Sequence, residues 1–494
     1  MAVEIEDKFD APAEFVVPDM RDIPGCAQVV GPKSHELVAL YFDTPDLRLA
    51  TRGITLRRRR GGDDPGWHLK LPKAKGVRRE VTHPLTRSAK IVPAELAGLV
   101  RAYTRGAELV PVARLDTKRN VTRLLGEDGE LLLEIADDRV KGTVLGEART
   151  VDRWREVEAE LVKGDRALLK RVGKRLRKAG AVPADASSKL ARLLGDRLRA
   201  KVSGPEEGTA GAVVVAYLAA QVNALLAQDA RVRQAEEDAV HQMRVACRRL
   251  RSALKSFKSI ITDTAEIQDE LKWLGQELSE ARDLEVIRAR FAAHFARLPE
   301  NLIVGPVRRR LGTDLADRER EAYDRIREVL SGDRYYALLD ALDTLIAHPP
   351  LTPLAAKKPD KPLRAVAAKS WARIGRLYAA AQALDDIEAR ELAMHDVRKA
   401  AKRARYTAEV LAPVLGAEMT GMARRAEAIQ EVLGRYQDSV AAQALLADAA
   451  ETARQAGEDT FTYGVLVGLE RAAAERDHAE FPRVWRESTA QTSS

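Results

Sequence analysis

The chain is poor in cysteine, in aromatic residues and in strongly apolar runs. Its 494 residues include 2 cysteines, which excludes a disulfide framework and a four-cysteine zinc site and fits a reducing compartment. Aromatic residues make up 5%, which argues against readout of single-stranded nucleic acid by stacking. The first ten residues are acidic and lack the basic region of a signal peptide. We therefore expect a cytoplasmic protein.

The longest apolar run, from Ala210 to Ala227, is rich in alanine and contains Gln221 and Asn223. A membrane span needs about 20 strongly apolar residues, so a packed helix is the better interpretation and a membrane span the alternative. With 45% hydrophobic and 32% charged residues, the chain can bury cores and keep a charged surface. This composition excludes a wholly disordered protein.

Positive charge is concentrated in the front part of the chain. Residues 1–201 contain 40 Lys+Arg against 30 Asp+Glu, a net +10, whereas residues 202–494 contain 42 against 44, a net −2, giving +8 in total. The front part is therefore suited to binding an anion. An anion site in the rear part would depend on local clustering of basic residues.

The residue pattern changes near residue 205. Up to about residue 160, short segments of period two alternate with turn signals such as Gly61–Gly66, and residues 163–179 follow a helical pattern. Later segments have helical periodicity and are interrupted by a proline-rich stretch at 349–362. We expect an α+β protein of two domains, at 1–202 and 211–490, joined by a linker at 203–210, with the second domain in halves of about 211–348 and 363–490.

The two rear halves resemble each other. His241 and Arg244 in one half correspond to His395 and Arg398 in the other at an offset of 154 residues. Arg282-Asp283 and Gln437-Asp438, each expected to follow an amphipathic helix, match at an offset of 155. Two matches at nearly one offset predict an internal duplication, each copy a bundle of about four helices.

Several predicted strands carry charges on one face, because alternate residues of a strand point to the same side. These same-face sets are Glu4/Glu6/Lys8, Arg57/Arg59, His68/Lys70, Arg78/Glu80, Arg119/Arg123, Glu134/Asp138 and Glu156/Glu158/Glu160. Each set alone fits an ordinary antiparallel sheet with a solvated face. Together they predict a charged lumen, in which clustered carboxylates suit Mg²⁺ or Mn²⁺ and guanidinium groups suit phosphate oxygens.

An ordered set of motifs resembles the CYTH family, the triphosphate tunnel metalloenzymes. The motifs are Val3-Glu4-Ile5-Glu6-Asp7-Lys8, Tyr41-Phe42-Asp43-Thr44, Leu56-Arg57-Arg58-Arg59, Trp67-His68-Leu69-Lys70, Arg78-Arg79-Glu80, Glu134-Ile135-Ala136-Asp137-Asp138, Glu156-Val157-Glu158-Ala159-Glu160 and Ser188-Lys189. The resemblance implies an N-terminal eight-stranded antiparallel β-barrel tunnel that acts on triphosphates with a divalent metal ion.

The resemblance also implies the roles of individual residues. Expected metal ligands are Glu4, Glu6, Asp138, Glu158 and Glu160. Expected triphosphate-binding residues are Lys8, Arg57, Arg59, Lys70, Arg78, Arg119, Arg123 and Lys189. The expected catalytic set is Glu4, Glu6, Lys8, Glu158 and Glu160. The choices of Asp138 over Asp137 and of Arg119 over Lys118 rest on strand phase.

Such a site supports attack on a terminal phosphoryl group, which needs positioning and charge neutralisation more than covalent help. We expect a metal-dependent triphosphatase, a phosphoric anhydride hydrolase acting on inorganic triphosphate, polyphosphate ends or another triphosphate. A nucleotide cyclase, in which the ribose hydroxyl replaces water, and a tunnel that only binds polyanions are the alternatives. The sequence does not distinguish which triphosphate is the substrate.

Two basic stripes are expected along helices of the rear part, because their residues recur every three or four positions. The first stripe is His241, Arg244, Arg248, Arg251 and Lys255, and the second is His395, Arg398, Lys402 and Arg405. The first would extend roughly 20 Å at the helical rise. A surface helix with a basic face by chance is one alternative. Metal binding by the histidines is opposed by the surrounding arginines, and nucleic acid is disfavoured because the stripes lack stacking residues.

The repeated segments resemble the CHAD domain, an α-helical module found fused to CYTH domains, over about residues 211–485. The resemblance implies binding of inorganic polyphosphate on a basic surface between the two bundles, and with it an association with polyphosphate granules. The second copy departs from the first at Lys402, at Glu409 in place of Lys255 and at Gln437 in place of Arg282. The expected partners are thus polyphosphate and a triphosphate-containing small molecule, without a membrane.

Overall fold

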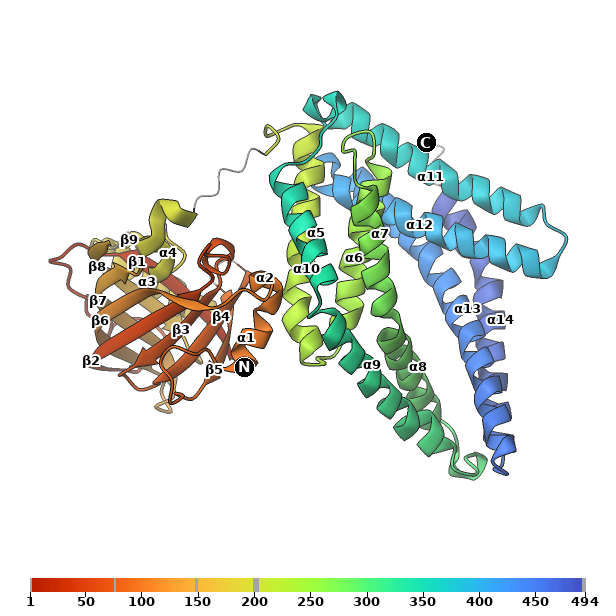
Figure 1. Ribbon diagram of the computed structural model, residues 1–494, viewed down its shortest axis with the longest axis horizontal. Coiled ribbons are helices and arrows are strands. Elements are labelled where there is room, and N and C mark those ends of the chain that lie inside the picture. Colours follow the sequence, from red (N-terminus) through yellow and green to blue (C-terminus); the bar gives the residue numbers. More distant parts are fainter. Residues whose placement is uncertain (1, 75–76, 147–149, 199–203, 491–494) are drawn as a thin grey trace. The chain divides into compact units, whose positions relative to one another are not determined.

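The computed structural model describes residues 2–74, 77–146, 150–198 and 204–490, with the side chains of residues 2–4, 73 and 74 excepted (Figure 1). The chain divides into two compact units, Met1–Lys201 and Val202–Ser494. The first unit is a β-barrel with several helices, and the second unit is helical.

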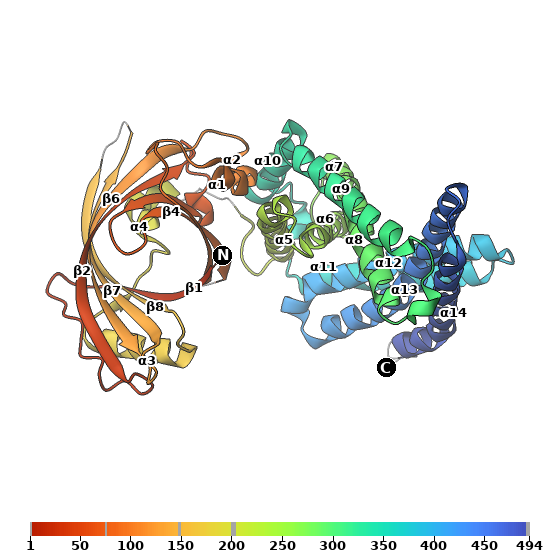
Figure 2. The ribbon, with the colours of Figure 1, turned by 90° about the horizontal axis from the view of Figure 1, so that it is seen from below.

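The first unit is a closed antiparallel barrel. Its strands are β1 (Ala2–Asp10), β2 (Gln28–Asp43), β3 (Thr55–Arg60), β4 (Gly66–Ala74), β5 (Val77–His83), β6 (Val110–Leu125), β7 (Leu131–Val144) and β8 (Val151–Leu161). They pair in the order β5-β4-β3-β2-β6-β7-β8-β1, and β1 closes the ring on β5. The ring is seen end-on in Figure 2. The prediction of an eight-stranded antiparallel tunnel is confirmed by this ring in the described residues, to which a short β9 (Val182–Pro183) adds at β1.

Short helices complete the first unit. They are α1 (Ala94–Leu99), α2 (Arg101–Thr104), α3 (Arg166–Lys178) and α4 (Lys189–Leu194). Asp165 caps α3, whose apolar face packs with Phe9 of β1 in one core cluster. Ser188 caps α4 by accepting a hydrogen bond from Ala191 N at 3.0 Å. Leu190 of α4 lies in a second core cluster, and this packing holds the start of the helix, and therefore Lys189, inside the barrel.

The second unit is built from long helices. They are α5 (Ala210–Arg233), α6 (Ala239–Ser256), α7 (Ala265–Glu277), α8 (Ser279–Phe295), α9 (Leu315–Val329), α10 (Asp333–Ala347), α11 (Asp360–Gln382), α12 (Ile387–Leu415), α13 (Ala417–Gln455) and α14 (Phe461–Ala490). Among the described residues, the second half has the expected four helices, whereas the first half has six. The count for the first half was wrong because α9 and α10 extend it.

The duplicated segments occupy comparable places. Arg244 of α6 donates to Ser279 O at 3.2 Å in α8, and Arg398 of α12 donates to Gln437 Oε1 at 2.8 Å in α13. The expectation that Gln437-Asp438 follows a helix was wrong, since α13 runs unbroken through it. In the first copy, Leu278 separates α7 from α8 at the same level.

In the described part of the chain, α5 alone is long and apolar enough to cross a membrane by length and composition. Its most apolar window has a mean hydropathy of 1.8, and 44% of that window is buried. The central helix of a bundle passes the same test. Here α5 contacts α6 and α10, and Val214, Leu218 and Leu225 are among its buried side chains, as the interpretation as a packed helix requires.

Candidate active site and polyanion surface

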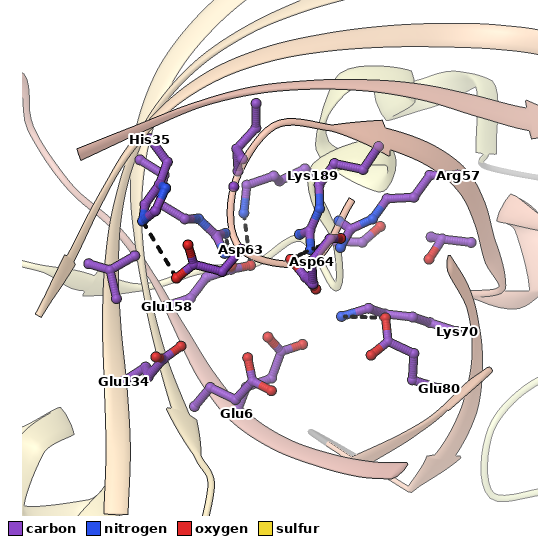
Figure 3. A pocket seen from close by; sticks show the side chains of 18 of the residues that line it. Glu6, His35, Arg57, Asp63, Asp64, Lys70, Glu80, Glu134, Glu158 and Lys189 are labelled. Atoms are coloured by element: carbon purple, nitrogen blue, oxygen red, sulfur yellow. Dashed lines mark hydrogen bonds and ion pairs between the residues drawn. The ribbon is translucent and has the colours of Figure 1, made fainter. Parts of the chain in front are cut away.

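The barrel encloses a cavity of about 250 Å³ lined mainly by charged side chains (Figure 3). Of the residues expected in the site, those that line it are Glu6, Lys8, Arg57, Arg59, Lys70, Arg78, Arg119, Arg123, Glu158, Glu160 and Lys189. Asp138 is buried beneath this lining with no exposed surface. Glu4 belongs to β1, but its side chain lies outside the described residues. All eight strands therefore turn polar side chains into one lumen.

Three carboxylates form one row across adjacent strands. Glu6 of β1 is the register partner of Glu160 on β8, and Glu160 is the partner of Glu134 on β7. Strands are about 4.8 Å apart, so neighbouring members of the row can share one cation. Glu134 was not among the expected metal ligands, although its same-face relation to Asp138 pointed to it. We call Glu6, Glu134 and Glu160 the acidic row.

A second carboxylate cluster lies deeper in the barrel and is already paired with lysine and arginine side chains of the protein. Oxygens of Asp138, Glu156 and Glu158 lie within 4.8 Å of one another. Lys189 Nζ is 3.0 Å from Asp138, 2.6 Å from Glu156 and 2.9 Å from Glu158. Arg119 Nη2 is 2.6 Å from Asp138 and 2.8 Å from Glu158, and Lys8 also pairs with Glu158.

These ion pairs fix the charge states of the deep cluster. Burial alone would raise the pKa of Glu158, but Lys189, Lys8 and Arg119 hold it well below its usual range. Burial would likewise lower the pKa of Lys189, yet Glu156, Glu158 and Asp138 raise it. Both groups therefore stay charged at neutral pH. The negative charge of this cluster is compensated by protein cations. In the acidic row, Glu6 and Glu134 also have basic partners, while their side chains line the cavity.

The donor set fits a divalent cation that prefers oxygen ligands. Glu6, Glu134, Glu158 and Glu160 all line the cavity and offer only carboxylate oxygens, which suit Mg²⁺ or Mn²⁺. Glu6 lies 3.0 Å from Lys8 and 3.7 Å from Arg78, Glu134 pairs with Arg123 at 2.6 Å, and Glu158 also belongs to the deep cluster. In the part of the chain that the structure describes, the carboxylates whose oxygens lie close enough together to hold one metal ion are those of the deep cluster, Asp138, Glu156 and Glu158.

The opposite wall of the cavity is cationic. Arg57 reaches Tyr41 Oη at 3.5 Å, and Lys70 lies 3.8 Å from Glu80. Among the described residues, the buried Nε atoms of Arg57 and Arg59 find no hydrogen-bond partner. Burial and repulsion from Arg57 and Arg119 lower the pKa of Arg59. Phosphate oxygens placed here would satisfy these donors and relieve the repulsion.

An acidic loop between β3 and β4 reaches into the same wall. Asp63 lies 3.0 Å from Lys33 and 3.1 Å from Arg123, and Asp64 pairs with Arg59. Gly61 and Gly62 precede them with positive φ of 80° and 76°, a conformation that glycine adopts without strain. Figure 3 shows both aspartates among the basic side chains of the cavity. Their carboxylates therefore neutralise part of the positive charge of Arg59 and Arg123.

Sequence reasoning treated Gly61–Gly66 as a turn and missed the two aspartates as part of the site. Tyr41 and His35 of β2, which also line the cavity, were missed too. Glu80 could have been found from its alternation with Arg78. No local signal marked Asp63, because its contacts with Lys33 and Arg123 join distant parts of the chain.

In the helical unit, the two basic stripes lie on helices that pack together. Arg249 Nη2 on α6 is 3.0 Å from Glu409 Oε2 on α12, and Thr407 donates to Ser256 Oγ at 3.0 Å. Burial, with repulsion from Arg398 and Arg248, lowers the pKa of Lys402 to about 8. Charges of both stripes are therefore close enough to repel one another.

A second group of cations gathers further along the same pair of helices. Arg403 of α12 is the main cause that lowers the pKa of Lys255 on α6, and Arg373 and Arg251 contribute. Burial, Arg373 and Arg251 also lower the pKa of Arg403. Neither Arg373 of α11 nor Arg403 was expected. Arg403 is adjacent to Lys402 in sequence, whereas nothing in the sequence connects Arg373 with the stripes.

The stripe residues differ in the ion-pair and hydrogen-bond partners that the protein gives them. Arg405 pairs with Glu409 at 2.9 Å and Glu427 at 2.8 Å. The buried Nε atoms of Arg248, Arg251 and Arg398 have no hydrogen-bond partner. His241 is close to Arg282, Arg248 and Arg244, and burial together with these charges lowers its pKa. His395 lies in α12 and is partly buried. Arg248 and Arg251 therefore keep N–H donors that the described residues do not satisfy, whereas Arg398 also donates to Gln437 Oε1 at 2.8 Å.

Comparison with known proteins gives matches over both units. Residues 4–194 match the CYTH domain family and residues 216–447 match the CHAD domain family. Two proteins of Mycobacterium tuberculosis, Rv2226 of strain H37Rv and MT2285 of strain CDC 1551 / Oshkosh, are each 38% identical over 492 residues. The alignments cover 96% of this chain and 94% of each relative.

Solved structures resemble parts of the chain at lower identity. PptA from Streptomyces chartreusis is 24% identical with a TM-score of 0.47, covering 56% of this chain and 99% of its own. The CHAD domain from the plant Ricinus communis is 24% identical with a TM-score of 0.48, covering 59% and 95%. HpAC1 from Hippeastrum, described as having a dominant triphosphatase activity, is 20% identical with a TM-score of 0.27, covering 39% and 95%.

Proposed function

Because the chain belongs to the family that joins a CYTH domain to a CHAD domain, we propose that its barrel hydrolyses a triphosphate and that its helical unit binds polyphosphate. Members of the CYTH family are triphosphatases or cyclases, and the family is metal-dependent. The observation that carries the proposal is the acidic row facing a wall of arginines and lysines across one enclosed cavity.

The basic and the acidic residues of the lumen have different roles in phosphoryl transfer. Arg57, Arg59 and Lys70 bind the non-bridging phosphate oxygens and hold the chain in line for attack. Glu6, Glu134 and Glu160 would hold Mg²⁺ or Mn²⁺, which supplies charge neutralisation and a water of lowered pKa when bound. In the overall reaction, water adds to the terminal phosphorus, one P–O–P bond breaks, and phosphate and the shortened chain leave.

The deep cluster has a supporting role in this proposal. Lys189 and Arg119 are held in place by Asp138 and Glu158 at 2.6–3.0 Å, so their remaining N–H groups point in fixed directions. Such a preorganised charge network costs little reorganisation during the reaction.

Phosphate release from tripolyphosphate, ATP and thiamine triphosphate, each with Mg²⁺ or Mn²⁺ and with a chelator, tests the proposal. A triphosphatase releases orthophosphate from at least one of them only with the metal. A cyclase would instead convert ATP to pyrophosphate and a cyclic nucleotide. Absence of both reactions would favour a binding protein without catalysis.

The acidic loop is expected to compete with the substrate. Asp63→Asn together with Asp64→Asn keeps the loop shape and removes two carboxylates from Arg123 and Arg59. We expect KM for tripolyphosphate to fall several-fold, because the phosphate no longer displaces a bound anion. Steady-state kinetics of the variant measures this.

Asp128→Asn, in an exposed turn of the same barrel, is the matched control and should leave KM unchanged. An unchanged or increased KM in the loop variant would contradict the competition and indicate that the aspartates assist binding instead.

The lowered pKa of Lys402 predicts pH-dependent binding in the helical unit. Lys402 faces Arg398, Arg248 and Arg244 as well as Asp438, and its pKa is about 8. A polyanion favours the protonated form, so affinity should fall as pH rises through 8. If a single proton is involved, the affinity can change by at most about tenfold per pH unit. Titrations with long-chain polyphosphate at pH 7, 8 and 9 measure the slope.

Lys402→Arg keeps the charge over this pH range and should flatten the profile. If the variant keeps the same slope as the wild-type chain, a different group causes the pH dependence.

A further inference from the structure

Four basic side chains without an ion pair lie together on the outer face of the barrel. Lys118 of β6, Arg139 and Lys141 of β7 and Arg153 of β8 are exposed. Among the described residues, none of the four forms an ion pair or a side-chain hydrogen bond. Neighbouring residues such as Arg119 and Asp138 point inward, so these four face away from the lumen. We call them the outer patch.

The strand register sets like charges directly opposite each other. Lys118 pairs in register with Arg139, and Arg139 with Arg155 on the next strand. One step along, Lys141 pairs in register with Arg153. Like charges at directly opposite positions destabilise a sheet, so this arrangement lowers the stability of the barrel relative to a surface on which charges of both signs alternate.

Carboxylates at the border of the outer patch do not neutralise it. Asp137 forms an ion pair with Arg155 at 2.8 Å, Asp116 forms one with Arg114 at 2.8 Å, and Asp10 forms one with Arg192. Glu36 is the register partner of Lys118 but forms no ion pair with it in the described structure. The outer patch therefore keeps a net positive charge.

The outer patch lies in a depression of about 950 Å³, lined by six cationic and three carboxylate side chains. Its one aromatic lining residue, Trp154, is 8% exposed, so no free ring is offered for stacking on a base. Its other apolar lining residues are Ala11, Ala13, Leu37, Val38 and Val140, and they offer no large apolar area to a protein or lipid partner. The outer patch extends over two strand spacings across the sheet and two residues along each strand, an area of roughly 10 by 7 Å. A few linked phosphates have this size.

We propose that the outer patch is a second anion site that binds a segment of linear inorganic polyphosphate on the outer wall of the barrel. The outer patch is positively charged and offers no exposed aromatic side chain. These properties suit a chain that consists of phosphate groups and has no bases. Binding here would raise the local concentration of long chains near the lumen, so that KM depends on chain length. This kinetic consequence rests on the proposed function, whereas the binding itself does not.

The test uses the full chain with Arg248→Glu and Arg251→Glu, which disables the first stripe, and fluorescent long-chain polyphosphate as the probe. Adding Lys118→Gln, Arg139→Gln, Lys141→Gln and Arg153→Gln should lower the remaining affinity by about tenfold, since exposed ion pairs contribute little singly. Affinity for tripolyphosphate, which fits the lumen, should not change.

The matched control removes four exposed charges, one just before α3 and three on it, as Lys163→Gln, Arg166→Gln, Lys170→Gln and Lys174→Gln. It should leave long-chain affinity nearly unchanged. Equal losses in the two variants, or no loss in the outer-patch variant, would overturn the proposal. Stronger binding of a single-stranded oligonucleotide than of polyphosphate would overturn the ligand. Because binding is measured directly, a chain without hydrolytic activity still gives an answer.

Discussion

Glu160→Gln is expected to abolish metal-dependent phosphate release while the barrel stays folded. Glu160 lies at the centre of the acidic row, between Glu6 and Glu134 in register. Glutamine keeps the shape but removes the charge that a divalent ion needs. Loss of a residue that only supports a ligand typically costs about 10- to 100-fold, so loss of a ligand itself should cost at least that much. Phosphate release at saturating metal, together with the thermal midpoint, measures both effects.

Glu158→Gln makes an informative comparison. Glu158 pairs with Lys8, Lys189 and Arg119, and removing one partner of a buried ion pair costs about 3–5 kcal/mol. We therefore expect Glu158→Gln to lose both activity and stability, and Glu6→Gln to behave like Glu160→Gln. Wild-type turnover in both Glu6→Gln and Glu160→Gln would refute the metal assignment.

Reversal of three arginines between α6 and α12 is expected to remove long-chain polyphosphate binding by the helical unit. Arg248 and Arg251 have buried Nε atoms without a partner, and Arg403 lies close to Arg251. Changing all three to glutamate in the full chain should lower affinity by at least about 100-fold, because charged contacts in desolvated positions are costly to lose. Binding should also weaken steeply with salt, as polyanion binding generally does.

The control reverses three exposed arginines elsewhere in the same unit, Arg318, Arg476 and Arg486. The net charge changes equally, so a general loss of attraction would affect both variants alike. An equal loss would mean that the stripes have no special role. Competition by tripolyphosphate should be poor, since it covers a small part of a stripe of roughly 20 Å.

The structure shows where strand phase is a sufficient guide. Asp138 and Arg119 face the inside, whereas Asp137 pairs with Arg155 on the outside at 2.8 Å and Lys118 is exposed. These positions follow from alternation alone, because successive side chains of a strand point to opposite faces. The same rule put Glu6 and Lys8, and Arg57 and Arg59, on one face each.

Alternation does not reveal which residues become neighbours across strands. The row Glu6–Glu160–Glu134 depends on the register of three strands that are far apart in sequence. The compensation of Asp138 by Lys189 depends on α4 packing inside the barrel. Register and packing come from cooperative burial over the whole unit, so Glu134 was omitted from the expected ligands.

The sequence by itself determined the two-part architecture, a β-rich front part and the helical faces that carry the stripes, because period and composition are local properties. The closure of the strands into a barrel was implied by the resemblance to the CYTH family. Only the tertiary structure decided which charges are neutralised by the protein and which remain for a ligand. Arg405 is paired while Arg248 is not, and Asp63 reaches Arg123 across 60 positions of sequence. Electrostatic energy depends on distance and burial, and both are set when segments distant in the chain pack together.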